Sequence, residues 1–139
     1  MFLSWRTEMK FNALIPELSV KDIQNSLHFH TNILNFKIEY ERKEDKFAFL
    51  SYGNAQLMIE EINENWNTGK LEYPFGRGVN FQIETTDIEE IQQSLKQHQI
   101  QPFKDIFESS YCSNHTIYKQ KELLVLDPDG YLLRFSKDL

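Results

Sequence analysis

The sequence predicts an α+β fold in which two βαβββ modules curl their mixed sheets around a concave cleft. The order strand, helix and then several strands occurs twice, at about residues 10–61 and 78–138. In both copies an Asp-Ile pair begins the helix, and a Gly-containing turn leads into the final strand. One such unit is too small to bury a face of its open sheet alone, so two copies, in one chain or across a dimer, would share a cleft. The alternative is a single antiparallel sheet with helices on one face and no internal symmetry.

The first module begins with a predicted strand at residues 11–20. Pro16 cannot donate a ladder hydrogen bond, so it belongs at an edge, a kink or the strand exit. Ser19 or Asp22 can cap the next helix, and Asn35 would end it. The positions that recur at helical spacing are Ile23, Leu27, His30 and Leu34. Three strands joined by turns follow, at residues 36–42, 46–52 and 55–61.

The second module repeats this order after a linking loop at 62–77, a segment rich in Asn, Gly and Pro. A strand at 78–85 leads to a helix that Thr86 or Asp87 can cap. Three further strands are predicted near residues 102–107, 116–126 and 131–136. Both modules belong to one domain of 139 residues, a length that supports a hydrophobic core without disulfides.

Charge and cysteine content exclude several classes of protein. The formal net charge is −6, and Lys and Arg form no dense cluster, which argues against a nucleic-acid partner. The acidic balance favours cationic ligands. Cys112 is the single cysteine, so no disulfide forms within the chain, and a cytoplasmic location is expected. No signal peptide or membrane span is recognisable, and Met9 is an alternative start that would make residues 1–8 an extension.

Two segments carry a family resemblance. Residues 18–36 begin Leu-Ser-Val-Lys-Asp-Ile, and residues 127–135 read Asp-Pro-Asp-Gly-Tyr-Leu-Leu-Arg-Phe. They resemble the first strand and helix, and the closing turn and strand, of the vicinal-oxygen-chelate superfamily. That superfamily includes glyoxalase I, extradiol dioxygenases, fosfomycin-resistance enzymes and bleomycin-resistance proteins. Residues 47–50 and 74–81 are more similar to the bleomycin-resistance branch.

Enzymes of this superfamily hold a divalent metal through inward-facing strand positions. The resemblance places those positions at Ile15, Met58, Asn80 and Arg134. Ile15 has no donor atom, Met58 offers a soft thioether, and Arg134 is a fixed cation. A register slip would bring Glu17 or Glu60 inward, but it would not make Arg134 a ligand. We therefore expect no metal and no cofactor.

The remaining reactive side chains do not form a recognisable catalytic motif. His28 and His30 are two residues apart on a helix and point to different faces. His98 lies near a helix end and His115 in a predicted loop, so all four histidines are interpreted as structural or surface residues. Cys112 has no base partner nearby in the sequence, and neither a nucleophile elbow nor a Gly-rich phosphate loop is present. The sequence predicts no catalytic residue.

The candidate binding residues follow from strand alternation, which places every second side chain on one face. Apolar walls with a few polar anchors are typical of a ligand cleft. Trp66 on the linking loop and Tyr111 on a second-module loop would cover the cleft. Arg134 would pair with Glu60 or Glu17. The predicted ligand-binding residues are Phe47, Phe49, Met58, Glu60, Trp66, Asn80, Gln82, Tyr111, Leu132 and Arg134.

The resemblance implies a metal-independent protein that sequesters a cationic or aromatic, bleomycin-like ligand without turnover and thereby confers antibiotic resistance. In bleomycin-resistance proteins a proline in the first strand redirects the N-terminal arm onto the partner subunit. Pro16 stands at the matching position, so we expect it to be the arm hinge of a homodimer. One alternative is a metal-dependent lyase, transferase or dioxygenase. Another is a regulatory or immunity-like domain that binds a protein through the aromatic residues at 66–75.

Overall fold

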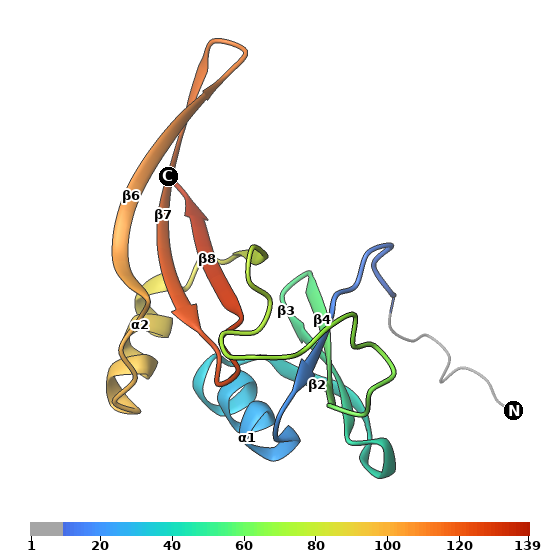
Figure 1. The fold of residues 1–139 in the computed structure, drawn as a ribbon. Helices are drawn as coiled ribbons and strands as arrows, with labels where there is room; N and C mark the ends of the chain where they lie inside the picture. Colours follow the sequence, from blue (N-terminus) through green and yellow to red (C-terminus); the bar gives the residue numbers. More distant parts are fainter. Residues whose placement is uncertain (1–9) are drawn as a thin grey trace, which may run out of the picture.

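The protein folds into two βαβββ modules, each with its own four-stranded sheet (Figure 1). The computed structural model describes residues 10–139, so the predicted extension at residues 1–8 lies outside the described part of the chain. The α+β fold class and the repeated module order are confirmed. Among the described residues, no helix has the length and apolar character needed to cross a membrane.

The elements of both modules follow the same order. The first module contains β1 (Glu17–Val20), α1 (Ile23–Leu27), the π-helix η2 (His28–Ile33), β2 (Lys37–Arg42), the short η3 (Lys43–Asp45), β3 (Phe47–Tyr52) and β4 (Ala55–Glu61). The second contains β5 (Asn80–Glu84), α2 (Ile88–Gln97), β6 (Lys104–Ser113), β7 (Thr116–Leu126) and β8 (Leu132–Asp138). The N-terminal sheet has the order β1-β4-β3-β2 and the C-terminal sheet β5-β8-β7-β6. In each sheet the first strand pairs with the last in parallel and the other pairs are antiparallel.

One hydrophobic core joins the helix-facing sides of the two sheets. Leu18 and Ile59 contribute from the N-terminal sheet, and Leu123 and Phe135 contribute from the C-terminal sheet. Ser94 on α2 donates a hydrogen bond to the carbonyl of Ile33 at 2.6 Å, so the helices of the two modules also meet. The opposite faces of the sheets, here called the N-terminal face and the C-terminal face, therefore lie on the sides turned away from this shared core.

Two strand predictions were wrong in their extent. The first strand begins at Glu17 rather than at residue 11, although Pro16 already accepts a hydrogen bond from the Met58 amide through its carbonyl. The strand predicted near 102–107 continues to Ser113, so Tyr111 lies in β6 and not in a loop. With β7, this strand forms a long hairpin that projects beyond β8 (Figure 1).

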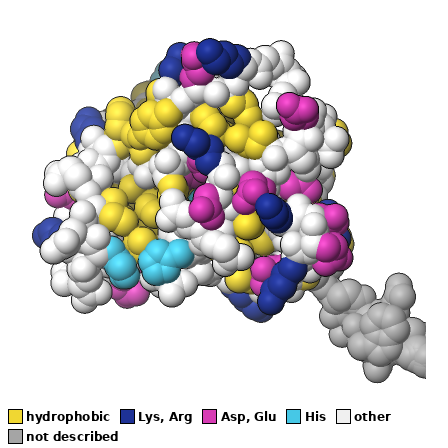
Figure 2. Space-filling view, turned by 60° about the horizontal axis from the view of Figure 1, so that its bottom comes forward, with side chains coloured by type: hydrophobic (Ala, Val, Ile, Leu, Met, Phe, Trp, Pro, Cys, Tyr) yellow, Lys and Arg dark blue, Asp and Glu magenta, His cyan; other side chains and the backbone are white. Residues whose placement is uncertain are grey.

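The first helix changes its winding along its length. Asp22 caps it by accepting a hydrogen bond from the Asn25 amide at 3.1 Å. After Leu27 the chain continues as a π-helix, a form that is rare and frequent at functional sites. His30 is completely buried in this segment, whereas His28 is exposed. The exposed ring of His28 meets that of His98 at 6.2 Å between centroids, and Figure 2 shows histidines beside apolar side chains on the underside of the molecule.

Candidate functional site

Four of the ten predicted binding residues lie together on the N-terminal face. Phe47 and Glu60 are register partners across β3 and β4, and so are Phe49 and Met58. Glu17 of β1 stands opposite Met58 on the other side. Strand alternation places these five side chains on the same face. The face combines aromatic rings with two carboxylates.

Phe49 is covered on this face although it points away from the main core. Its exposed fraction is 1%, and it is not part of the core that the helices share. Tyr40 stacks on it with 5.4 Å between ring centroids, and Phe11 meets it edge-on at 5.3 Å. The segment that carries Phe11 is held by Asn12, whose backbone amide donates a hydrogen bond to the side-chain oxygen of Gln56 at 2.8 Å. A ligand ring that contacts Phe49 must therefore displace Phe11 or Tyr40.

Replacing Phe11 with alanine should uncover Phe49 at a small cost in stability. Phe11 is 58% exposed, so the loss of its edge-on contact should lower the free energy of unfolding by about 1 kcal/mol. Urea unfolding measures this loss. Leu14→Ala is the matched control, because Leu14 is 84% exposed and its truncation should change stability little. Equal losses in the two variants would contradict the covering role of Phe11.

The carboxylates give the N-terminal face an unbalanced negative charge. Burial, followed by repulsion from Glu60, raises the pKa of Glu17 above its ordinary value. Oε2 of Glu17 is buried and has no hydrogen-bond partner among the described residues. Arg42 is the cation nearby, and it lies over the ring of Phe47 at 3.9 Å while donating to Asp45. A bound cation would stabilise the ionised form of Glu17 and supply its missing partner.

The C-terminal face is organised around Arg134. Its guanidinium donates to Oε1 of Glu122 from Nε at 3.1 Å and from Nη2 at 2.8 Å. Nη1 donates to Oδ1 of Asn80 at 3.0 Å, and Ser109 donates to the second oxygen of Glu122 at 3.2 Å. The predicted partners of Arg134, Glu60 and Glu17, were wrong. Glu122 on the adjacent strand β7 takes that place, and sequence reasoning missed it.

The other predicted residues occupy separate positions. Gln82 and Leu132 flank Arg134 and Asn80 on the C-terminal face, as the β5–β8 register shows. Tyr111 stacks on Tyr118 near the end of the β6–β7 hairpin, with 5.2 Å between centroids. Trp66 stands exposed on the linking loop. The structure thus places four predicted residues on each of two faces of one chain, with Trp66 on the linking loop and Tyr111 near the hairpin end.

The metal positions implied by the superfamily enzymes do not fit a metal ion. Ile15 and Met58 offer no hard donor, and the amide oxygen of Asn80 already accepts from Arg134. The Arg134 cation would itself repel a divalent ion. Within residues 10–139, no group of three or more His, Cys, Asp or Glu side chains is arranged to hold a metal.

Two βαβββ modules, each with its first and last strands paired in parallel, define a protein of the vicinal-oxygen-chelate, or glyoxalase, superfamily. Residues 22–138 match the family model described as glyoxalase domain-containing protein 4-like, C-terminal domain. The chain belongs to this family. A search of curated proteins gave no match.

Several solved structures are similar. A glyoxalase/bleomycin resistance protein/dioxygenase superfamily member from Vibrio splendidus is 34% identical, with 88% of this chain and 95% of that chain covered and a TM-score of 0.41. A virulence protein from Salmonella typhimurium is 20% identical, with coverage of 94% and 100% and a TM-score of 0.67. A fosfomycin resistance protein from Listeria monocytogenes is 18% identical, with coverage of 91% of each chain and a TM-score of 0.57. The last two likenesses concern the fold alone.

Proposed function

We propose that this protein is a metal-independent small-molecule-binding protein that sequesters a cationic, aromatic, bleomycin-like ligand in the cytoplasm without turnover. The observation that carries the proposal is the N-terminal face, where Glu17 and Glu60 stand beside the rings of Phe47 and Phe49. A carboxylate oxygen without a partner attracts a cation, and aromatic faces hold flat or cationic groups. The side chains at the superfamily's metal positions support binding without a metal.

The active form in this proposal is a homodimer. Each chain presents four of the ten predicted binding residues on its N-terminal face and four on its C-terminal face. In a two-fold dimer, the N-terminal face of one copy would meet the C-terminal face of the other, and two equal clefts would form. Residues 10–16 lie along their own β4 in the single chain, and Pro16 would be the hinge that passes this arm to the partner. Sedimentation analysis should give a dimer at micromolar concentration, and a monomer would contradict this assembly.

Titration calorimetry with metal-free bleomycin tests the binding proposal. We expect one ligand per chain and no chemical change in the recovered ligand. Glu60→Gln should weaken binding about tenfold, equivalent to ~1.4 kcal/mol, because it removes one carboxylate from the face. Glu44→Gln makes the same charge change at an exposed position outside the predicted set and should leave the affinity unchanged.

Two results would overturn parts of the proposal separately. The absence of binding heat with bleomycin would exclude this drug as the ligand. A stoichiometric divalent metal in the purified protein, measured by elemental analysis, would exclude metal independence. The metal-dependent lyase, transferase or dioxygenase would then be favoured.

A further inference from the structure

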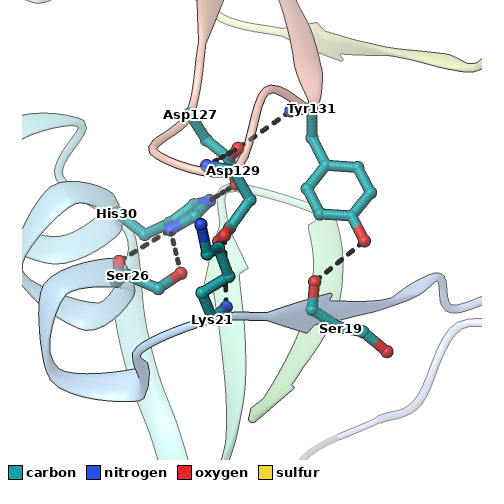
Figure 3. A network of polar contacts seen from close by, with 7 residues as sticks. All are labelled: Ser19, Lys21, Ser26, His30, Asp127, Asp129 and Tyr131. Carbon is teal, nitrogen blue, oxygen red and sulfur yellow. Dashed lines mark hydrogen bonds and ion pairs between the residues drawn. The ribbon is translucent and has the colours of Figure 1, made fainter. Parts of the chain in front are cut away.

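The closing turn of the second module, residues 127–131, is hydrogen-bonded to the end of β1 and to the residue that follows it. Oδ1 of Asp129 accepts a hydrogen bond from the Lys21 amide at 3.1 Å. The hydroxyl of Tyr131 donates to the carbonyl of Ser19 at 2.9 Å. Figure 3 shows the turn lying against β1 and the helix, with Asp127 directed toward His30. The turn is therefore part of the seam between the two modules.

At the centre of this seam a histidine and an aspartate face each other out of reach of solvent. The side chains of His30 and Asp127 are both 0% exposed, and Nε2 of His30 lies 3.7 Å from Oδ2 of Asp127. These two atoms have no hydrogen-bond partner among the described residues. The π-helix turns His30 inward, so this contact joins η2 of the first module to the turn of the second.

The surrounding hydrogen bonds fix how many protons the pair holds. Nδ1 of His30 lies 2.8 Å from the Ser26 carbonyl, which accepts only, so Nδ1 carries a hydrogen. Oδ1 of Asp127 accepts from the amides of Asp129 and Tyr131, each at 2.9 Å. This leaves Nε2 and Oδ2 facing one another. If neither atom carries a proton, their lone pairs repel each other. If both atoms carry a proton, the pair is a buried cation without a counter-ion.

We propose that His30 and Asp127 share one proton, carried on the Asp127 carboxyl, and that this neutral pair clamps the two modules together. Placing the proton on Asp127 leaves both groups uncharged, the form that burial favours. The other charges at the seam act in the same direction. Asp129 faces Asp127 and disfavours a second negative charge, while Lys21 is engaged with Asp129. Tyr131 is neutral, because burial followed by the two aspartates raises its pKa to about 12.

The proton moves from His30 to Asp127 as the chain folds. Burial raises the pKa of Asp127 from 3.8 to about 7. Burial also lowers the pKa of His30 from 6.5 to about 4. Between pH 4 and 6.5 the folded pair thus holds one proton on Asp127, and the unfolded chain holds one on His30. The two proton counts are equal, so the pair contributes almost no pH dependence to stability in this window.

Single substitutions should tilt the pH profile of stability in opposite directions relative to the parent protein. Without His30, the folded chain binds the extra proton at Asp127, so the stability of His30→Leu should fall as the pH rises from about 4 to about 7. Without a titratable Asp127, the unfolded chain binds the extra proton at His30. The stability of Asp127→Asn should therefore fall as the pH drops from 6.5 toward 4.

Urea unfolding of the full chain at several pH values between 4 and 8 measures these slopes. His28→Gln is the matched control, because His28 is exposed on the same helix and its change should leave the parent's pH profile unchanged. Tilts of the same sign in both variants would overturn the proposal. If a variant fails to fold, NMR of the parent protein at pH 5.5 decides the question. A protonated Asp127 carboxyl and a neutral His30 ring support the shared proton, and a carboxylate facing an imidazolium contradicts it.

Discussion

Replacing Gly130 with alanine should destabilise the protein by at least about 3 kcal/mol. Gly130 adopts a φ of +91°, which strains any residue with a Cβ. A Cβ there would also stand 2.5 Å from Cα of Pro74, a backbone atom of the linking loop. The loop is tied at this point by the Phe75 amide, which donates to the Asp129 carbonyl at 2.8 Å. The added methyl group must therefore move either the turn or the loop.

Gly53→Ala separates the two causes of this loss. Gly53 adopts a φ of +57°, but a Cβ at this position would meet no atom within 4 Å. Its substitution should cost about 1 kcal/mol from backbone strain alone. Urea unfolding at one pH measures both variants. Equal losses at the two glycines would mean that the close approach of Pro74 does not limit this position.

The second large effect is expected at Arg134. In Arg134→Leu, Glu122 loses both hydrogen bonds from the guanidinium while its side chain remains nearly buried. An uncompensated buried carboxylate costs about 3–5 kcal/mol, and the Ser109 hydrogen bond offsets part of this. We therefore expect the free energy of unfolding to fall by about 3 kcal/mol, measured by chemical denaturation.

A double substitution tests whether the buried charge causes the loss. Arg134→Leu combined with Glu122→Leu removes both charges and should recover most of the lost stability. Arg42→Leu is the exposed comparison, because the Arg42–Asp45 pair lies at the surface and should contribute at most about 1 kcal/mol. If the double variant is no more stable than Arg134→Leu, the loss comes from packing and not from the unpaired carboxylate.

The elements that the sequence predicted well are those bounded by turn residues. The turns at Gly53-Asn54 and Asp127 to Gly130 delimit β3, β4, β7 and β8 to within about two residues. The upper part of β6 was missed, because Glu108 to Ser113 is mostly polar and exposed and shows no apolar alternation. The first strand was predicted too long, since its apolar residues continue through a segment that packs as an arm and does not pair as a strand.

The candidate site was predictable within a strand but not between strands. Alternation correctly placed Met58 with Glu60, and Asn80 with Gln82. The partner of Arg134 depends on the β7–β8 register. In this register Arg134 stands opposite Leu124, and Glu122, two residues before Leu124 on β7, is on the same face. Alternation along β7 was the signal that could have found Glu122. The contact between His30 and Asp127 left no such signal, because it depends on a π-helix and on the docking of two modules.

The hairpin that extends beyond β8 has a consequence for the behaviour of the protein at high concentration. β6 is the outermost strand of its sheet, so its free backbone groups present a template on which a strand of another molecule can add. Lys104, Asp105 and Glu108 place opposite charges along this strand, and three serines lie in its second half. An incoming strand would have to bury or match these groups at each step. The same polar residues that made the strand hard to recognise in the sequence thus disfavour the addition of another strand at this edge.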